Sequence, residues 1–567
     1  MFRKNTAHRQ ASLFGVAAQL PAGKLKKLRA SWAYPFYQLI FCQIREEDFA
    51  ILYAEAASRP NAPVNALVAA IILMQRNNWT TEALFERIDF DLLTRTALGL
   101  DTLDETPFCP ATFFNFRNRL LDHFTQTGQN LLETVFDALT AEQLKTLQLK
   151  TAVQRCDSFM AMSNIRSYGR TQLLIEMLIR LYRVLSDEDK TRFETLLSPY
   201  IKQSSSHYIY ALERSAIPHE QDTLGQLYHT LYEALKDRYQ EIDIFGIFER
   251  VYTEHFTVAD GTITIKPSDQ LDGGTLQSPD DIDATYRKKR NEAFRGQSVN
   301  VTETADPDNP VNLVTDVAVA PNTTDDSTLL NGRLESIKTK TPDVNELHTD
   351  GAFGSEVNDQ KMEELEIKHV QTAVRGRKAE VSIDIEEIEQ DRYQVSCPHQ
   401  SVEAQATSSR HKACFDASVC QTCPMNTRCP AKESKSGRTF YFDRSDALRQ
   451  QRLRNIDTLP PARKNLRPNV EATVKEFTKP FNHKGKLRVR GQFATMLYAQ
   501  AMAIAINFGR IWRYLSDNPT ELPLCRRLLR LFFYLPTSIA RNVHEKWGLP
   551  RKCKSENHSK QKQRKAA

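Results

Sequence analysis

The first 145 residues have the apolar spacing that is typical of helices. Apolar residues recur every three or four positions in 65–77 (NALVAAIILMQRN) and in 81–98 (TEALFERIDFDLLTRTAL), and Thr80 or Thr81 can cap the second run. A further helix is predicted over 110–124, because Pro110 suits a first helical turn. Short helices that carry Arg and Lys are typical of a domain that reads DNA. A helical dimerisation module has the same pattern, so both alternatives stay open.

A different pattern begins near residue 147, where short alternating runs carry two aspartates. Residues 147–160 (LQLKTAVQRCDSFM) predict a strand that delivers Asp157, and the runs 294–304 and 312–320 predict a hairpin. The pattern continues with a helix over 325–338, a short strand and turn over 346–354 that contains Asp350, a helix over 358–366 and a strand over 367–374. Strand, hairpin, helix, strand, helix, strand is the order of an RNase H-like α/β core.

An RNase H-like core takes a third acid from a later helix. The candidate is 466–477 (LRPNVEATVKEF), in which Pro468 suits the first turn and Glu471 lies one turn further on. A long apolar helix over 493–515 follows, and we expect it to close the core.

These patterns predict five regions. They are an N-terminal helical DNA-binding or dimerisation domain (1–145), an RNase H-like catalytic core (146–168, 286–380 and 458–520), a mostly helical insertion (169–285), a Cys-rich insertion (381–457) and a basic C-terminal segment (521–567).

Charge is concentrated at the two ends of the sequence. The formal net charge is +6, while the first 45 residues hold eight Lys or Arg and no acid, and the last 17 hold seven against Glu556. Cationic segments suit a polyanion such as DNA, because each neutralised phosphate releases counterions. A solvated tail without a partner has the same composition, so charge supports nucleic acid without establishing it.

No segment is predicted to span a membrane, and the cysteine pattern does not resemble a disulfide scaffold. The best apolar stretch, 496–511, is interrupted by Gln500, Asn507 and Arg510, whereas a span needs roughly 20 apolar residues. Five of the ten cysteines are clustered in a long chain. We therefore expect a reducing, cytoplasmic location.

Asp157, Asp350 and Glu471 form a pattern that suits phosphodiester chemistry. That chemistry activates one oxygen and stabilises another, and two Mg²⁺ or Mn²⁺ ions held by carboxylates do both. Each of the three acids comes from a different element. Acids alone are weak evidence, since the chain has 70 of them and most exposed acids are only solvated.

The surrounding sequence resembles the DDE transposases of bacterial insertion sequences. CDSFMAMSNIR (156–166) is similar to the first-Asp segment of that family, TDGAFGS (349–355) to its second-Asp turn, and RPNVEATVKEF followed by GKLRVRGQFAT (485–495) to its Glu segment and the Arg-Gly step after it. SPDDIDATYRKK (278–289), FRGQSVNVTET, APNTTDDSTLL (320–330) and the N-terminal runs also match in order. The resemblance spans about residues 30–515, and it places the metal-binding acids of the family on Asp157, Asp350 and Glu471.

The resemblance also implies basic residues that contact DNA. Arg467 stands four residues before Glu471, where related enzymes have the Arg of a Tyr–Arg–Glu–Lys signature, and Arg490 lies in the Arg-Gly step. Here the sequence departs from the pattern. Lys464 occupies the Tyr position, and Thr478 follows seven residues after the Glu, with Lys475 and Lys479 on either side. Either lysine suits the basic role, and a Glu471–Lys475 surface ion pair is the alternative.

Other polar residues lie near the predicted core strands. Asp283, Asp316, Asp325 and Asp326 are weaker metal-ligand candidates, and the last two favour a helix N-terminus, where the dipole stabilises acids. His348, two residues before Asp350, is a candidate partner of the site.

The cysteine cluster is a candidate structural zinc site. Cys397, Cys414, Cys420, Cys423 and Cys429 lie close together, and Cys420-x2-Cys423 has the spacing with which two thiolates bind one Zn²⁺. Cys397 with either Cys414 or Cys429 would complete the site. Reduced thiols without metal are the alternative.

The resemblance implies a transposase that binds terminal inverted repeats, cleaves DNA with Mg²⁺ or Mn²⁺, and joins the freed 3′-hydroxyl to target DNA. Its expected partners are double-stranded DNA and further copies of the chain, as a dimer or larger complex. An RNase H-like nuclease or resolvase without strand transfer would use the same acids. An inactive, domesticated DNA-binding protein is the non-enzymatic alternative.

Overall fold

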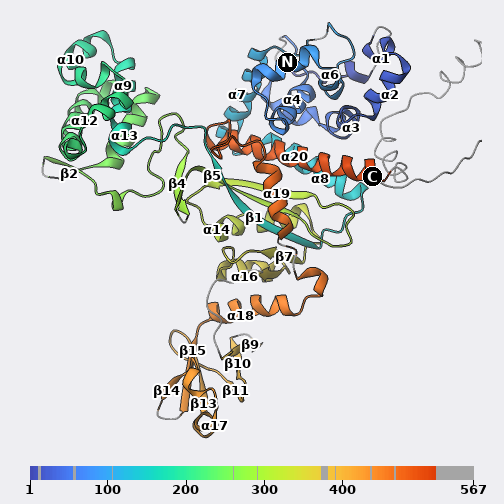
Figure 1. Cartoon of the computed structure of the whole chain (residues 1–567), viewed down its shortest axis with the longest axis vertical. Coiled ribbons are helices and arrows are strands. Elements are labelled where there is room, and N and C mark those ends of the chain that lie inside the picture. Colours follow the sequence, from blue (N-terminus) through green and yellow to red (C-terminus); the bar gives the residue numbers. More distant parts are fainter. Residues whose placement is uncertain are drawn as a thin grey trace, which may run out of the picture. The chain divides into compact units, whose positions relative to one another are not determined.

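The structure is a computed structural model that describes residues 1–518, except 10–14, 55–58, 105, 260, 290, 372–380, 390, 435–436, 465 and 467 (Figure 1). The predicted basic segment 521–567 therefore lies outside the described residues. The described residues up to Asp517 belong to one compact unit.

The N-terminal region is helical, as predicted. Its α-helices are α1 (Val16–Gln19), α2 (Ala22–Ala30), α3 (Ala33–Leu39), α4 (Val64–Arg76), α5 (Thr81–Phe90), α6 (Leu92–Ala97), α7 (Pro110–Thr127) and α8 (Leu131–Thr146), with short 3₁₀ turns between them. The Thr80 hydroxyl accepts a hydrogen bond from the Ala83 N–H (3.1 Å) and caps α5. The run 81–98 is helical as predicted, but it forms two helices, because Asp91 ends α5 and its carboxylate caps α6.

A mixed α/β sheet follows, and its central strand carries Asp157. The strands are β1 (Val153–Met162), β4 (Thr285–Lys289), β5 (Glu292–Thr304), β6 (Val314–Pro321), β7 (Glu346–Thr349) and β8 (Lys368–Gln371). Their order is β4-β5-β1-β7-β8, and β6 also pairs with β5. β1 runs antiparallel to β5 and parallel to β7, which in turn runs parallel to β8. The hairpin predicted over 294–304 and 312–320 corresponds to β5 and β6.

Helices pack on this sheet. α14 (Asp326–Asn331), α15 (Leu334–Lys340) and α16 (Glu356–Glu364) contribute apolar side chains to a cluster that includes Cys156 of β1. The single helix predicted over 325–338 is wrong, because Gly332 and Arg333 interrupt it between α14 and α15. α19 (Pro468–Thr478) and the long helix α20 (Gln492–Asp517) were both predicted and contact β1 and β6, respectively.

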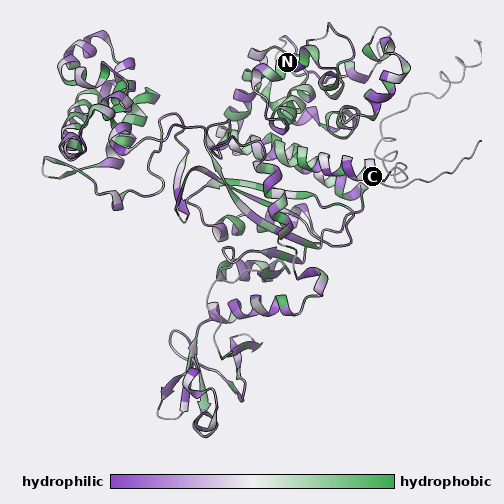
Figure 2. Cartoon of the chain, viewed as in Figure 1, coloured by the Kyte–Doolittle hydropathy of each residue, from purple (hydrophilic) through white to green (hydrophobic). Residues whose placement is uncertain are grey.

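α20 is buried over much of its length, and hydrophobic residues are frequent along it (Figure 2). It contacts β6, α4 and α8, and its Phe508 ring lies 5.2 Å from the ring of Phe36 between centroids. Among the described residues, no helix combines the length and the apolar character needed to cross a membrane.

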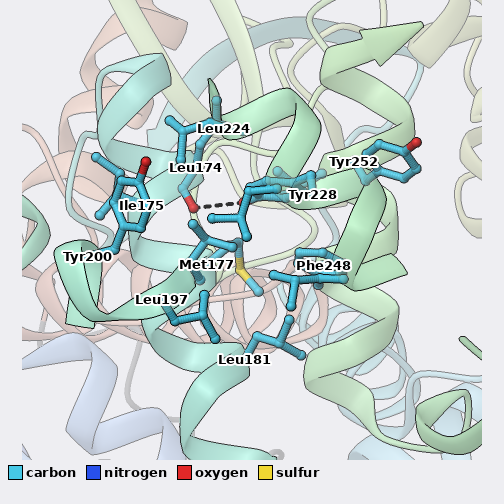
Figure 3. Close-up of a cluster of buried hydrophobic side chains, with 14 of the residues drawn as sticks. Leu174, Ile175, Met177, Leu181, Leu197, Tyr200, Leu224, Tyr228, Phe248 and Tyr252 are labelled. Carbon is cyan, nitrogen blue, oxygen red and sulfur yellow. Dashed lines mark hydrogen bonds between the residues drawn. The ribbon is translucent and has the colours of Figure 1, made fainter. Parts of the chain in front are cut away.

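The segment between β1 and β4 is mostly helical, as predicted. It contains α9 (Arg170–Val184), α10 (Asp187–Ile201), α11 (Ser205–Ala211), α12 (Ile217–Tyr239) and α13 (Asp243–His255), followed by the hairpin β2 (Phe256–Ala259) and β3 (Thr262–Ile265). These helices bury their own apolar cluster, in which Tyr228 stacks on Phe248 and its hydroxyl donates to the Leu174 carbonyl (2.7 Å) (Figure 3). The segment thus has a core of its own.

The region with the clustered cysteines contains two small sheets. β9 (Asp384–Glu389), β10 (Arg392–Cys397) and β11 (Gln400–Glu403) form one, and β12 (Gln405–Ala406), β13 (His411–Asp416), β14 (Lys432–Ser434) and β15 (Gly437–Phe442) form the other. α17 (Ala417–Thr422) and the 3₁₀ turn η6 (Asn426–Arg428) lie between β13 and β14 in sequence. The strands of this region end at Phe442, and α18 (Arg444–Asp457) follows with an Asp443–Asp446 capping box.

Candidate active site

Strand pairing brings Asp157 and Asp350 to the same level of the sheet. β1 and β7 are parallel neighbours, and Arg155 pairs with His348. Asp157 and Asp350 each stand two residues further along, with Asp350 just past the end of β7. The Ser158 N–H donates to Asp157 Oδ1, and the Ala352 N–H donates to Asp350 Oδ1, each at 2.8 Å. Both aspartates are half-buried, so their backbones are fixed while their side chains reach the surface.

The helix that carries Glu471 packs on the same face of β1 as Asp157. Side chains alternate along a strand, so Arg155, Asp157 and Phe159 share one face. Arg155 Nη1 donates to the Leu466 carbonyl (3.0 Å), just before α19, and the Phe159 and Phe477 rings lie 5.6 Å apart between centroids. Asp157 therefore faces the side of the sheet that α19 covers.

Within α19, Glu471 lies beside a buried stripe. Val470, Thr473 and Phe477 are fully buried, at the spacing of one helix face. Glu471 is exposed and stands about 100° around the helix from Val470. The helix thus buries one face against the core and leaves the Glu471 carboxylate at the edge of that contact.

A buried polar network ties α19 to the sheet. Glu303 of β5 is fully buried and accepts hydrogen bonds from Arg155 Nε (2.6 Å), the Thr473 hydroxyl (2.7 Å) and Arg510 Nη1 (2.7 Å). Arg510 of α20 also donates to Thr473 and to Glu476. Burial alone would lower the pKa of Arg510, but the carboxylates of Glu303 and Glu476 more than offset this and raise it.

Most of the weaker acid candidates have structural partners. Asp316 is buried and bonded to Arg333 (2.5 Å) and Lys340 (2.8 Å). Asp283 accepts from the Gln492 N–H (3.0 Å) at the start of α20, and Asp325 forms an ion pair with Arg287 (3.6 Å). These contacts account for the three carboxylates without a metal ion.

Asp326 differs from these three acids in its surroundings. Its Oδ1 is buried without a hydrogen-bond partner among the described atoms. Burial raises the pKa of Asp326, and the nearby Asp350 carboxylate raises it further, whereas a hydrogen bond with the Ser158 side chain and the charge of Arg287 lower it. Asp326 approaches β1 on the side of Ser158, opposite to the face that carries Asp157. No local pattern distinguishes this residue from its neighbour Asp325.

The expected DNA-binding residues are placed as follows. Lys475 and Lys479 are exposed on α19, and the described contacts include no ion pair between Lys475 and Glu471. The Arg490 side chain is half exposed, and its Nε donates to the Asn164 carbonyl (2.8 Å). Arg467 lies outside the described residues. His348 is fully buried, and its Nε2 lies 2.7 Å from Glu346 Oε1.

The possible metal sites are not preformed. Among the residues that the structure describes, no group of three or more His, Cys, Asp or Glu side chains is arranged to hold a metal ion. Of the three candidate acids, Asp157 and Asp350 lie on or next to adjacent strands, and Glu471 lies on the helix that packs on β1. Of the five candidate zinc ligands, Cys397, Cys420, Cys423 and Cys429 line one cavity, and Cys414 does not.

Two family models match the chain. The model of a transposase domain (DUF772) matches residues 35–119, and the model of a transposase DDE domain matches residues 392–512. The two matches together support a DDE-type transposase of an insertion sequence. Enzymes of this family cleave and join DNA and normally use divalent metal ions.

The two matches cover different parts of the transposase. The first runs from within α3 to within α7. The second covers the clustered cysteines from Cys397 onward, α19 with Glu471, and most of α20. Asp157 and Asp350 lie outside both. No curated protein and no solved structure matches the transposase.

Proposed function

We propose that the transposase cleaves DNA and joins its 3′ ends to a target on an RNase H-like core, with Asp157, Asp350 and Glu471 as its catalytic acids. The proposal rests mainly on strand register. Asp157 and Asp350 each lie two residues beyond a paired residue of the parallel strands β1 and β7, so they lie next to each other across the two strands. The strand order supports the fold assignment: β1 has the antiparallel strands β5 and β6 on one side and the parallel strands β7 and β8 on the other.

The donor set suits Mg²⁺ or Mn²⁺. Three carboxylates are the oxygen ligands that these hard cations prefer, and Asp157 shares its face of β1 with the α19 contact. Asp157 and Asp350 would hold ions from the strands, and Glu471 would complete the site from the helix. When bound, two divalent ions stabilise the attacking and leaving oxygens of an in-line displacement.

The protein would position the DNA around these acids. Backbone pairing fixes the strands that carry Asp157 and Asp350, and the buried network ties α19, which carries Glu471, to the sheet. Lys475 and Lys479, which are exposed on α19, would contact the phosphates next to the scissile bond, as would Arg490 and Arg467. The N-terminal helices and basic segments would bind the terminal inverted repeats. Pairing two transposon ends requires two or more copies of the chain.

The proposed reaction has two displacements at phosphorus. Water attacks first, which breaks a phosphodiester bond and leaves a 3′-hydroxyl at the transposon end. That hydroxyl then attacks a target phosphodiester, so one P–O bond forms as another breaks and no further energy source is needed. A nuclease or resolvase would stop after the first displacement.

A strand-transfer assay tests the proposal. DNA carrying the sequences that flank the transposase gene would be incubated with Mg²⁺ or Mn²⁺ and with wild type, Asp157→Ala, Asp350→Ala or Glu471→Ala. Glu364→Ala is a matched control, because Glu364 is an exposed acid at the end of α16. We expect joined products from wild type and the control and none from the three variants.

Each other outcome would point elsewhere. Cleavage without joining favours the nuclease or resolvase. Specific binding without cleavage favours an inactive DNA-binding protein, and activity that survives Glu471→Ala shows that another residue is the third acid.

A further inference from the structure

The region with the clustered cysteines has little apolar core of its own. Among the described residues of this region, the buried cluster consists of nine, including Tyr393, Phe415 and Phe442, and spans both small sheets. Cys397, Cys420 and Cys429 pack against its edge. A small domain with so few buried apolar residues commonly needs an additional cross-link, such as a structural metal.

Four thiols from three separate places line one small cavity. Cys397 ends β10, Cys420 lies in α17, Cys423 follows the end of α17, and Cys429 follows the turn η6. The cavity has a volume of about 20 Å³, which is room for one water-sized group. Apolar side chains, including Val381 and Phe415, form much of the remaining wall. Gln400 Nε2 lies 3.3 Å from the Cys420 sulfur and donates to it.

Strand alternation excludes the fifth clustered cysteine. Phe415 of β13 is buried and lines the cavity, so its neighbour Cys414 points to the opposite face of the same strand. Cys414 is exposed, and its sulfur lies 4.0 Å from the Thr439 hydroxyl. The sequence left Cys414 and Cys429 as alternative ligands, and the structure favours Cys429.

We propose that Cys397, Cys420, Cys423 and Cys429 bind one structural Zn²⁺. Four thiolates are the usual closed ligand set of a structural zinc site, and the two residues between Cys420 and Cys423 allow both to reach one ion. Each thiol releases its proton on binding, and no oxidation or reduction occurs. Among the described residues, no three such side chains are already arranged to hold a metal ion, so the proposal requires the four cysteine side chains to move into ligand positions when zinc binds.

Such an ion would join parts of the chain that are otherwise held by few apolar contacts. Cys397 belongs to the sheet of β9–β11, whereas the other three cysteines lie between β13 and β14 of the second sheet. Zinc would therefore cross-link the two sheets. It would stabilise the segment that precedes α18 and α19, and it would take no part in the phosphodiester chemistry.

Metal analysis of the full-length protein tests the proposal directly. The protein would be purified without chelators and its zinc and iron measured by mass spectrometry, for wild type, Cys420→Ser, Cys429→Ser and the matched control Cys414→Ser. We expect one zinc per chain in wild type and control. Loss of an outer-shell partner typically lowers metal affinity about 10–100-fold. Loss of one of the four ligands should lower the zinc affinity by more than that.

A second measurement covers the case in which the ligand variants fail to fold. Zn²⁺ would be added back to metal-stripped wild type, and reactive thiols would be alkylated and identified by mass spectrometry. We expect zinc to protect the four cavity cysteines, while the exposed Cys109 and Cys414 still react. Absence of zinc, bound iron in its place, equal protection of Cys414, or zinc retained in Cys429→Ser would each overturn the proposal. Neither measurement depends on DNA cleavage.

Discussion

The two parts of the candidate active site are held in place by different interactions. Asp157 and Asp350 are placed by backbone pairing between β1 and β7, which single side-chain changes leave intact. Glu471 lies on α19, whose position depends on apolar packing and on the side-chain network around Glu303. The strand-held pair is therefore positioned by backbone pairing, and the helix-held acid by a few specific side chains.

This difference predicts where the site is vulnerable. Substitutions far from the acids should barely move Asp157 relative to Asp350, whereas a change in Glu303, Thr473 or Arg510 should move Glu471. Buried polar networks of this kind stabilise a structure only when every member has its partner.

The largest expected effect is that of Glu303→Ala. Removal of this carboxylate leaves Arg155 and Arg510 buried without their shared partner, and breaking a buried ion pair costs about 3–5 kcal/mol. We expect a clearly lower Tm together with loss of DNA cleavage. Thermal unfolding of Glu303→Ala and of Glu476→Ala, whose carboxylate is a third exposed, provides the comparison. Equal stability of both variants would show that the network does not hold α19.

Changing the length of an acid by one methylene should lower the cleavage rate more for Asp157 than for Glu471. Asp157→Glu cannot be accommodated by the paired strand, and a misplacement of about 1 Å costs about 10²-fold in rate. Glu471→Asp should lose less, about tenfold, because side-chain contacts that hold α19 can readjust. Single-turnover cleavage rates at saturating Mg²⁺ measure both. A larger loss for Glu471→Asp would reverse the comparison.

The sequence predicted the elements that carry the acids better than the interactions that position them. The strand at Asp157 and the helix with Pro468 and Glu471 have clear local patterns. The Glu303 network joins residues as far apart as 148 and 207 positions, and no local periodicity reports such contacts. The level of Asp157 and Asp350 depends on strand register, which emerges only when both strands pair.

Local patterns also could not predict the break in the helix expected over 325–338 or the choice between Cys414 and Cys429. The break between α14 and α15 falls at Gly332 and Arg333, within a run whose apolar spacing continues across it. The choice between Cys414 and Cys429 depended on which face of β13 points into the cavity. Spacing alone contains no information about that face.

A smaller effect is expected from Thr473→Val, which keeps the shape of the side chain. Its hydroxyl donates to Glu303 and accepts from Arg510, so the variant loses both bonds, at a net cost of about 1–2 kcal/mol. We expect a modest fall in Tm and a higher Mg²⁺ concentration for half-maximal cleavage, because Glu471 lies two residues away. Thr478→Val is the control, since that hydroxyl donates mainly to the Val474 carbonyl of its own helix (3.0 Å). Identical Mg²⁺ dependence in both variants would remove Thr473 from the positioning of Glu471.

The smallest effect is expected from Asp326→Asn, and it tests whether the acid site extends to the other face of β1. Asp326 is close to Ser158 and Asp350, but it approaches the strand on the side opposite to Asp157. If only the three proposed acids bind metal, the neutral amide should change the cleavage rate by no more than about tenfold. Because a negative charge near Asp350 is removed, the Mg²⁺ concentration for half-maximal cleavage should stay the same or rise slightly. A loss as large as that of Asp350→Asn, restored when Mn²⁺ replaces Mg²⁺, would instead make Asp326 a metal ligand. In that case Asp326, at the start of α14, would join Asp157 and Asp350 as the third carboxylate, and Glu471 would no longer be needed.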